Sequence, residues 1–320
     1  KNDFKRIKLG GQEFDKSKEL KKEYTKKLLT FIDVSLLPKL RIMVNSGNGA
    51  AGPTFDELES LLASSTNKLS FVKVHHMPDS SFPNGIPNPL LSKNHKENKD
   101  LTVKAGANLG IAFDGDFDRC FFFDENGNFI PGQYIVGLLA ETFLLKEPGA
   151  KIIHDPRVIW NIQNVVEKNG GIAIKSKTGH AFIKQSMRDN TALYGGEISA
   201  HHYFRDFAYC DSGMIPWLLI IELMGRTGKT LSELVAVQKT MFPSSGEINF
   251  ELADPRHSIE KVLVHYAGEF LSKEEFDGLT LTFDAWRLNL RSSNTEPLVR
   301  LNIESRGDSD LIDQKLAEIK

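Results

Sequence analysis

The sequence has little cysteine, no excess of either charge and no long apolar run. Two cysteines, Cys120 and Cys210, among 320 residues cannot build a disulfide framework, which favours a reducing, cytoplasmic setting. The 40 Lys and Arg residues nearly balance 42 Asp and Glu residues, so the charge indicates neither a nucleic-acid partner nor a membrane surface. The longest strongly apolar run, residues 214–224, is too short to span a bilayer and carries Glu222, so we expect a buried helix there.

The first thirty residues are basic, with ten Lys or Arg against five acids. This composition is typical of a solvated helix face, with Leu20, Tyr24 and Leu28 turned inward at every fourth position. The chain begins with Lys1 rather than Met and shows no apolar core of a signal peptide. We therefore expect a part of a longer protein, in which residues 1–19 are a linker or the remnant of a missing first domain.

Short apolar strands alternate with helical stretches from about residue 39, which is typical of α/β domains. After residue 242 the order changes to that of an α+β module, in which we expect a helix over 259–270. The predicted fold is therefore two α/β domains with mixed sheets, residues 20–128 and 129–241, followed by a smaller C-terminal α+β domain, residues 242–320. No internal repeat is evident from the sequence.

Three aspartates, Asp114, Asp116 and Asp118, alternate along FDGDFDR between two apolar runs, with Arg119 directly behind them. Like charges this close repel one another unless a cation compensates them, and Mg²⁺ and Ca²⁺ prefer oxygen ligands. An EF-hand has the same spacing but requires Gly at the position of Arg119 and helices on both sides, whereas these flanks are strand-like. The pattern predicts a strand, a metal loop and a second strand; a solvated acidic turn is the alternative.

Two further loops lie in the same predicted domain. NSGNGAAG, residues 45–52, connects a predicted strand to a helix whose N-terminus could hold an anion. Because the full G-x-G-x-x-G pattern is missing, a plain strand-to-helix turn fits equally well. Residues 78–90 form a proline-rich loop without periodicity, which is consistent with a functional loop or with a surface excursion.

A polar loop precedes a predicted strand near the C-terminus, in RSSNTEPLVR, residues 291–300. The guanidinium group, the hydroxyls and the amide in this loop offer hydrogen-bond donors that suit phosphate oxygens. A turn without a ligand has a similar composition. The candidate phosphate-binding residues are Arg291, Ser293, Asn294 and Thr295, with Ser292 beside them.

GEISAHH, residues 196–202, follows another predicted strand. If the segment is extended, Glu197, Ser199 and His201 share a face and could contact a polyol, with the imidazole moving a proton. His202 would then point the other way. A single His is more often a packed or surface residue, and this applies to His201 and to His180 in KTGH, while His75 and His76 are read as structural. The loops agree in indicating a divalent metal, a phosphate and a hydroxylated substrate.

Taken in order, FDGDFDR, KTGHAFIK, GEISAHHYF and RSSNTEP resemble the metal, phosphoryl-side, sugar-specificity and phosphate-binding motifs of the α-D-phosphohexomutase family. The resemblance covers nearly the whole chain and includes NSGNGAAGP and FPNGIPNPL. It implies a four-domain enzyme around a central cleft, of which this chain would supply the second, third and fourth domains. It is greatest to bacterial members that interconvert mannose 6-phosphate and mannose 1-phosphate through a bisphosphorylated sugar. Members acting on glucose or amino-sugar phosphates are the alternatives.

The resemblance also implies a role for each matched residue. Asp114, Asp116 and Asp118 would hold Mg²⁺, with Arg119 beside the transferred phosphoryl group, and His201 is similar to the family's candidate acid or base. The implied substrate-binding residues are Glu197 and Ser199 for sugar hydroxyls, Arg291, Ser293, Asn294 and Thr295 for the distal phosphate, Lys177, Thr178, Gly179 and His180 along the cleft, and Arg157, where some relatives carry lysine.

The sequence departs from the family in one respect. The family's nucleophile is a serine in a T-A-S-H-N-P motif of the first domain, and no such string occurs here. We therefore expect this chain alone to bind Mg²⁺ weakly and hexose phosphate poorly, without turnover. Two other classes stay open: a sugar-phosphate-binding protein without catalysis, and a phosphatase with an aspartyl nucleophile, in which Asp118 and Arg119 would lack roles. Nothing in the sequence indicates an oligomeric state.

Overall fold

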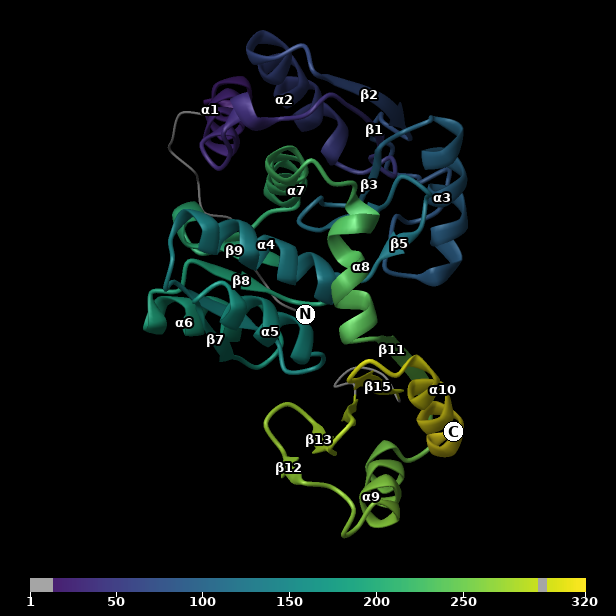
Figure 1. Cartoon of the computed structure of the whole chain (residues 1–320). Helices are drawn as coiled ribbons and strands as arrows, with labels where there is room; N and C mark the ends of the chain where they lie inside the picture. The colour runs from purple at the N-terminus through teal and green to yellow at the C-terminus, as the bar shows by residue number, and fades with distance from the viewer. Residues whose placement is uncertain (1–13, 293–297) are drawn as a thin grey trace, which may run out of the picture.

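The computed structural model describes residues 14–292 and 298–320 of the chain. These residues form three five-stranded sheets with their helices, which follow one another along the molecule in chain order (Figure 1). The first two sheets mix parallel and antiparallel strands, and the third is antiparallel throughout. The predicted class, two α/β domains followed by a smaller C-terminal α+β domain, is confirmed. Among the described residues, no helix is both long and apolar enough to cross a membrane.

The first unit has the strand order β2-β1-β3-β4-β5. Strand β1 runs parallel to β2 and β3, whereas β4 is antiparallel to β3 and β5. The sequence LGIAF of β3 is buried at every position, as expected for a strand that is covered on both faces. The elements of this unit are α1 (Ser17–Leu29), η1 (Val34–Leu36), β1 (Leu40–Asn45), α2 (Ala51–Ser65), β2 (Leu69–Val74), η2 (Ser92–Asn94), α3 (His95–Lys104), β3 (Leu109–Phe113), β4 (Cys120–Phe123) and β5 (Phe129–Ile130).

Helix α1 meets the sequence prediction only in part. Leu28 is buried and Tyr24 is partly buried, but Leu20 is 62% exposed. Only the second half of α1 contributes buried residues, namely Thr25 and Leu28. The prediction of an inward-facing Leu20 was therefore wrong, because the first turns of the helix do not reach the core.

The second unit repeats the topology of the first. Its strand order is β7-β6-β8-β9-β10. As in the first sheet, the first three strands are parallel to one another, and each of the last two is antiparallel to the strand before it in this order. The sequence showed no repeat, because the same order of apolar strands and helices can be built from unrelated residues. The elements are α4 (Gly132–Lys146), β6 (Lys151–His154), α5 (Trp160–Lys168), β7 (Ile172–Lys175), α6 (His180–Asn190), β8 (Tyr194–Gly196), β9 (His202–Phe204), η3 (Arg205–Phe207), β10 (Cys210–Asp211), α7 (Met214–Thr227) and α8 (Leu231–Met241).

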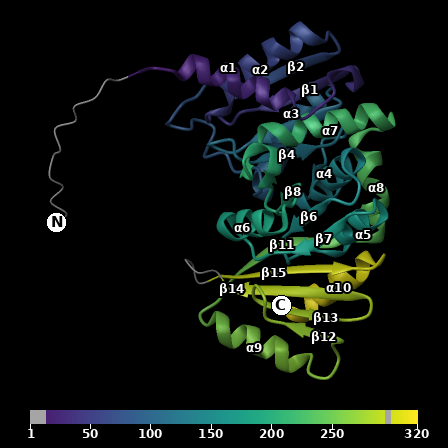
Figure 2. The same cartoon turned by 90° about the vertical axis from the view of Figure 1, so that its left-hand side faces the viewer.

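Helix α7 joins the first two units. It lies between them (Figure 2). The centroid of its Trp217 ring lies 5.6 Å from that of Phe55 and 6.2 Å from that of Phe71, both in the first unit. Residues of both units belong to one continuous hydrophobic core. The buried carboxylate of Glu222 is compensated by Lys146 at 2.6 Å and Arg226 at 2.7 Å. The predicted buried helix is confirmed, and the shared core holds the loops of the two units in a fixed relation.

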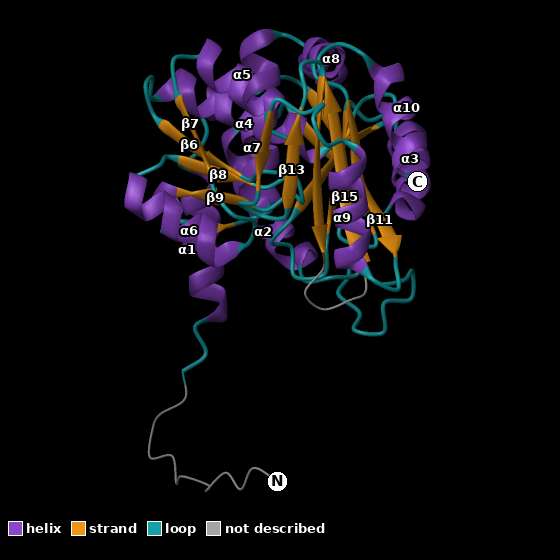
Figure 3. Ribbon diagram, turned by 90° about the horizontal axis from the view of Figure 1, so that it is seen from below, coloured by secondary structure: helices purple, strands orange, loops and turns teal. Residues whose placement is uncertain are grey.

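The third unit is a sheet of order β11-β15-β14-β13-β12 with α9 and α10 against it (Figure 3). Along β14, Trp286, Leu288 and Leu290 enter its core, so Arg287 and Arg291 lie on the opposite face. The elements are β11 (Ser244–Glu251), α9 (Pro255–His265), β12 (Ser272–Glu274), β13 (Leu279–Thr282), β14 (Trp286–Ser292), β15 (Leu298–Ser305) and α10 (Ser309–Ile319).

Helix α9 begins and ends earlier than the predicted range of 259–270. Its start is set by Asp254, whose side chain accepts a hydrogen bond from the His257 amide, and by Pro255 in the first turn. It ends at His265, shortly before Gly268, whose φ of +86° does not suit a right-handed helix. The apolar spacing gave the right helix but the wrong boundaries.

A buried ion pair attaches the third unit to the second. Arg287 Nη1 lies 2.7 Å from Glu304 Oε1, and both side chains are almost inaccessible to solvent. Arg287 also donates to the carbonyl oxygens of Pro156 and Arg157, both at 3.0 Å. Glu304 accepts from the backbone amides of residues 159–160, at 2.8 and 3.0 Å. The third sheet therefore fixes the loop that carries Arg157.

Candidate active site

The residues singled out in the first two units lie at the carboxyl ends of parallel strands. The loop 114–119 follows β3 in the first sheet, while Arg157 follows β6 and the loop 197–201 follows β8 in the second. KTGH, residues 177–180, follows β7. Ligand sites of open α/β sheets lie at this edge, because successive strand ends place their loops together.

The acidic loop connects two antiparallel strands, β3 and β4, as the sequence predicted. Asp114, Asp116 and Asp118 each offer a carboxylate oxygen, and these oxygens lie within 4.8 Å of one another. Burial raises the pKa of Asp118 to about 6; the positive charge available on His201 opposes this rise, and the carboxylates of Asp114 and Asp116 add to it. Asp118 Oδ1 is buried and has no hydrogen-bond partner among the described residues.

These features fit a hard divalent cation. Three converging carboxylates, one with a buried oxygen that has no hydrogen bond among the described residues and lies 3.6 Å from Arg119 Nε, are ligands of the kind that Mg²⁺ prefers. Arg119 compensates part of the negative charge, because its Nε lies 2.6 Å from Asp114 Oδ2 and its amide donates to Asp114 Oδ1 at 3.2 Å. The guanidinium group is thereby held at the edge of the acidic loop.

The glycine turn after β1 contacts the acidic loop and supports it. The amide of Ala50, at the start of α2, donates to the carbonyl oxygen of Gly115 at 2.9 Å. A Cβ atom on Gly49 would lie 2.5 Å from the same oxygen, so the close approach requires glycine. Of the two interpretations of NSGNGAAG, the structure favours the strand-to-helix turn over the anion cradle.

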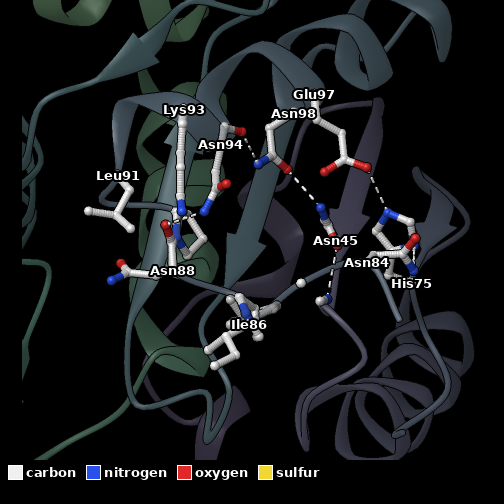
Figure 4. Close-up of a pocket in the computed structure, with 15 residues that line it drawn as sticks. Asn45, His75, Asn84, Ile86, Asn88, Leu91, Lys93, Asn94, Glu97 and Asn98 are labelled. Atoms are coloured by element: carbon white, nitrogen blue, oxygen red, sulfur yellow. Dashed lines mark hydrogen bonds and ion pairs between the residues drawn. The ribbon is translucent and has the colours of Figure 1, made fainter. Parts of the chain in front are cut away.

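The proline-rich loop lines part of a pocket of about 450 Å³ (Figure 4), whose lining also includes Phe113, the residue before the acidic loop. Its polar lining residues are largely paired with one another: Asn45 with Asn98 at 2.9 Å, and His75 with Glu97 at 2.9 Å and with Asn84 at 2.8 Å. Of the loop itself, Asn84 takes part in these pairs, but residues 78–81 and 83–86 are exposed and Ile86 is 77% exposed, so the loop lies largely on the surface. None of the described site residues predicted from the sequence lines this pocket.

The segment 197–201 is a turn and not the extended segment that the sequence argument assumed. The Glu197 amide donates to the His201 carbonyl at 2.9 Å, and Ala200 has a φ of +73°. The alternation argument for a shared face was therefore wrong, because the residues close the β8–β9 hairpin. The turn instead places Glu197 and His201 at its two ends. His202 does point away, into the core, where Tyr194 Oη lies 2.6 Å from its ring and burial lowers its pKa to about 3.

Glu197 is held in place by two hydrogen bonds and one ion pair. Tyr203 Oη donates to Oε1 at 2.6 Å, the Gly179 amide donates to Oε2 at 3.2 Å, and Arg157 Nη2 lies 3.8 Å from Oε2. Arg157 also donates to Ser199 Oγ at 3.4 Å. Glu197, Ser199 and Arg157, which the sequence singled out separately, therefore meet at one place.

Arg157 itself links the second and third units. Its guanidinium lies 2.7 Å from Asp155 and 3.1 Å from Glu247 of β11, and it is almost fully buried. The KTGH turn makes a similar link, because the amide of Thr178 donates to Asp277 at 2.9 Å. Lys177 lies 5.9 Å from the ring of Phe276.

Arg291 faces the same space from the third sheet. It is paired across the strands with Arg300, and Asp277 lies 3.8 Å away. Burial lowers the pKa of Arg291, and the charges of Arg157 and Arg300 add to the effect. An anion would relieve this repulsion. The predicted residues Ser293, Asn294 and Thr295 lie outside the described residues.

A cluster of imidazoles and carboxylates adjoins the acidic loop. His201 Nδ1 lies 3.2 Å from Asp211 Oδ2 and 3.7 Å from Asp118 Oδ2, and His180 Nδ1 lies 3.3 Å from the same Asp211 oxygen. Lys184 Nζ lies 3.2 Å from the other oxygen, Asp211 Oδ1.

Sequence reasoning missed Asp211, Lys184 and Arg300. Lys184 lies one helical turn after His180, so the two share a helix face. Arg300 alternates with apolar residues on its strand as Arg291 does. The sequence pattern could therefore have indicated Lys184 and Arg300 as neighbours of the predicted site. Nothing local marks Asp211, which reaches the site only through the pairing of β10 with β9.

The chain matches three domain descriptions of one family, Phosphoglucomutase/phosphomannomutase: alpha/beta/alpha domain II over residues 22–127, alpha/beta/alpha domain III over 131–241 and the C-terminal domain over 247–320. It is 57% identical over 300 residues to a phosphomannomutase of Salmonella montevideo, covering 94% of this chain and 66% of the relative. It is 51% identical over 320 residues to a phosphomannomutase of Vibrio cholerae, covering 100% and 69%. The chain thus spans 66% of the length of the Salmonella relative, slightly less than two thirds, and 69% of the Vibrio relative.

Solved structures of this family have a similar fold. A phosphoglucomutase/phosphomannomutase family protein from Burkholderia thailandensis superposes with a TM-score of 0.79 at 27% identity, covering 94% of this chain and 64% of that one. A putative phosphomannomutase from Thermus thermophilus gives 0.75 at 20% identity, covering 93% and 66%, which supports the fold.

Proposed function

The chain belongs to the phosphoglucomutase/phosphomannomutase family, and on that premise we propose that it forms the catalytic cleft of a phosphomannomutase that interconverts mannose 6-phosphate and mannose 1-phosphate. The observation that carries the proposal is the meeting of the acidic loop with the turn 197–201, where Asp118 and His201 are 3.7 Å apart. A metal loop and an imidazole at one point are what phosphoryl transfer to a sugar hydroxyl requires. A mutase for glucose or amino-sugar phosphates is the alternative.

The proposal assigns residues 20–128, 129–241 and 242–320 to domains II, III and IV, with 1–19 as a linker or remnant. The phosphoryl donor would be a phosphoserine, and the sequence contains no T-A-S-H-N-P string to supply it. In this proposal the serine belongs to a part of the protein outside these 320 residues. This chain alone would then bind hexose phosphate poorly and would not turn it over.

The acidic loop would serve the transferred phosphoryl group. Mg²⁺ held by Asp114, Asp116 and Asp118 would neutralise negative charge that develops during transfer. Arg119, already fixed against Asp114 at 2.6 Å, would place its remaining donors toward the phosphoryl oxygens. The loop therefore contributes both charge and orientation.

The turn 197–201 would serve the sugar. Glu197 and Ser199 would accept and donate hydrogen bonds to its hydroxyls, and Arg157 orients both of these side chains. His201 would remove the proton from the attacking hydroxyl and return it to the leaving oxygen in the reverse direction. Asp211, 3.2 Å from Nδ1, would stabilise the charged imidazole.

The third unit would hold the phosphate that is not reacting. Arg291 and Arg300, opposite each other on β14 and β15, supply the positive charge, and Ser293, Asn294 and Thr295 would complete the loop. Lys177, Thr178, Gly179 and His180 would line the cleft between the two ends of the substrate. If the third unit binds only the non-reacting phosphate and makes no contact that depends on the sugar's orientation, either end of the sugar can be placed at the reacting position.

The test is a mutase assay on the protein expressed from its complete reading frame in the source organism. We expect interconversion of the two mannose phosphates that requires Mg²⁺ and is faster than with glucose or glucosamine phosphates. A preference for another hexose phosphate would change the sugar but keep the reaction class. No turnover of any hexose phosphate by the complete protein, or turnover by these 320 residues alone, would contradict the proposal.

A further inference from the structure

One face of the third sheet carries charged and amide side chains and meets the second unit. We propose that Glu247 of β11 is an internal counter-anion, which weakens the binding of phosphate at Arg291 and Arg300. These two arginines are called the phosphate grip below. The inference rests on the function proposed above, because it takes the phosphate grip as the place that holds the non-reacting phosphate.

Strand pairing places Glu247 on the same face of the third sheet as the phosphate grip. Arg291 lies opposite Arg300 in the pairing of β14 with β15, and Arg300 lies opposite Asn249 in the pairing of β15 with β11. Side chains two residues apart on a strand share a face, so Glu247 is the diagonal neighbour of Arg300. A carboxylate therefore lies beside the two guanidinium groups.

The ion pairs of this face differ in length. Arg287 and Glu304 are 2.7 Å apart, within the usual range of about 2.7–2.9 Å for a charge-assisted hydrogen bond. Arg300 Nε and Glu247 Oε1 are 3.9 Å apart, and this nitrogen is buried without a hydrogen-bond partner in the described part of the chain. Arg300 is therefore attracted to Glu247 but not bonded to it, which leaves its donors for another anion.

An arginine of the second unit holds Glu247 in this position. Arg157 Nη1 donates to Glu247 Oε2 at 3.1 Å, so the other oxygen, Oε1, is the one that faces Arg300. The Glu247 side chain is only 18% exposed, and charges with little access to water are weakly screened by salt. The carboxylate thus stays beside the phosphate grip when an anion binds there.

Opposing charges meet at Arg291. Burial and the positive charges of Arg157 and Arg300 lower the pKa of Arg291, whereas the carboxylates of Asp277 and Glu247 oppose that shift. A phosphate at Arg291 would be attracted by the guanidinium groups and repelled by the carboxylates. Glu247 therefore reduces the affinity for phosphate while the arginines keep their charge.

A weakened phosphate grip suits a site that must release its phosphate in every turnover. In the proposed reaction the two ends of the bisphosphorylated sugar occupy the phosphate grip in turn, so one phosphate has to leave before the other enters. Binding that is equally strong for the substrate and the transition state lowers KM without raising kcat. A fixed carboxylate limits binding of this kind.

The first test measures the affinity of the 320-residue chain for inorganic phosphate by calorimetry at constant ionic strength. Glu247→Gln removes the charge but keeps the shape of the side chain and an oxygen that accepts from Arg157. We expect it to bind phosphate about 10-fold more tightly, because a carboxylate repels an anion bound beside it. A purely structural role predicts the opposite sign. An affinity within about 2-fold of the unsubstituted chain, a weaker one, or no binding by either protein would overturn the proposal.

Further variants separate this inference from the proposed function. Glu260→Gln makes the same charge change on an exposed position of α9, which packs on the other face of the sheet, and should leave phosphate affinity unchanged. Equal strengthening by Glu260→Gln would show an effect of net charge alone and overturn the proposal. Arg300→Gln should weaken binding; if it does so while Glu247→Gln has no effect, the phosphate grip stands and the counter-anion is wrong. In the complete protein, Glu247→Gln should lower KM without raising kcat.

Discussion

Asp118 and His201 face each other across two different sheets, with Oδ2 and Nδ1 3.7 Å apart. Asp118 belongs to the loop between β3 and β4, and His201 to the turn between β8 and β9, which are equivalent connections in the two repeated units. The shared core around Trp217 holds the units so that these connections meet. One copy of the topology therefore supplies the acidic loop, and the other supplies the imidazole.

Stabilisation of the chain by Mg²⁺ should depend on pH. The pKa of Asp118 rises from 3.8 to about 6 on folding without a cation, so the folded state binds this proton more tightly and loses that contribution as the pH rises through this range. A metal competes with the same proton. At 100 times its Kd, Mg²⁺ should add about 2.7 kcal/mol to the free energy of unfolding at pH 8, and this gain should fall to about half at pH 5, where Asp118 is mostly protonated.

Thermal unfolding with and without Mg²⁺ at pH 8 and pH 5 measures this effect. Asp116→Asn should reduce the gain at pH 8, because it removes one ligand. An equal gain at both pH values would show that Asp118 does not take part in binding.

Removal of Arg287 should strongly destabilise the third unit. Arg287→Ala leaves the buried carboxylate of Glu304 without its partner, and breaking such a pair costs about 3–5 kcal/mol. Denaturant unfolding measures the loss. Lys273→Ala is the matched control, because it breaks the exposed pair with Glu275 and should change the free energy of unfolding by less than about 1 kcal/mol. Similar losses for the two variants would argue against the interface as described.

A methyl group on Gly49 should displace the acidic loop without changing any of the three aspartates that we propose as Mg²⁺ ligands. The added Cβ of Gly49→Ala would lie 2.5 Å from the Gly115 carbonyl and push the loop outward. Mg²⁺ affinity, measured by calorimetry, should fall. Gly115→Ala is the control within the same loop, because its Cβ would meet only Phe82 and Pro87, at an ordinary 3.9 Å. If the two variants bind Mg²⁺ equally well, the glycine turn does not support the loop.

The sequence predicted what depends on local pattern. Apolar runs located β3 and β4, and the loop predicted between them does connect the two strands; the metal site in that loop stays a prediction. It could not predict the turn at 197–201, because the return of β9 along β8 decides that geometry. Asp211 was missed for the same reason: its place depends on the pairing of β10, which no local pattern encodes.

Long-range packing explains the other differences. Helix α7 looked like an ordinary buried helix, yet it packs on Phe55 and Phe71 of the preceding unit and so joins the cores of the first two units. Leu20 had helical spacing but lies beyond the core that its helix covers. Apolar periodicity says which residues can be buried, whereas the tertiary arrangement decides which of them are.

His201 should affect turnover far more than substrate binding. In the complete protein, His201→Gln removes the group that we propose moves the proton of the sugar hydroxyl, so kcat should fall by about 10²–10⁴-fold while KM changes little. Glu197→Gln should mainly raise KM, because Glu197 is proposed to hold the sugar. His265→Gln, which is exposed in the third unit, should leave both constants unchanged. A rise in KM alone for His201→Gln would make the imidazole a binding group and leave the proton transfer to another residue.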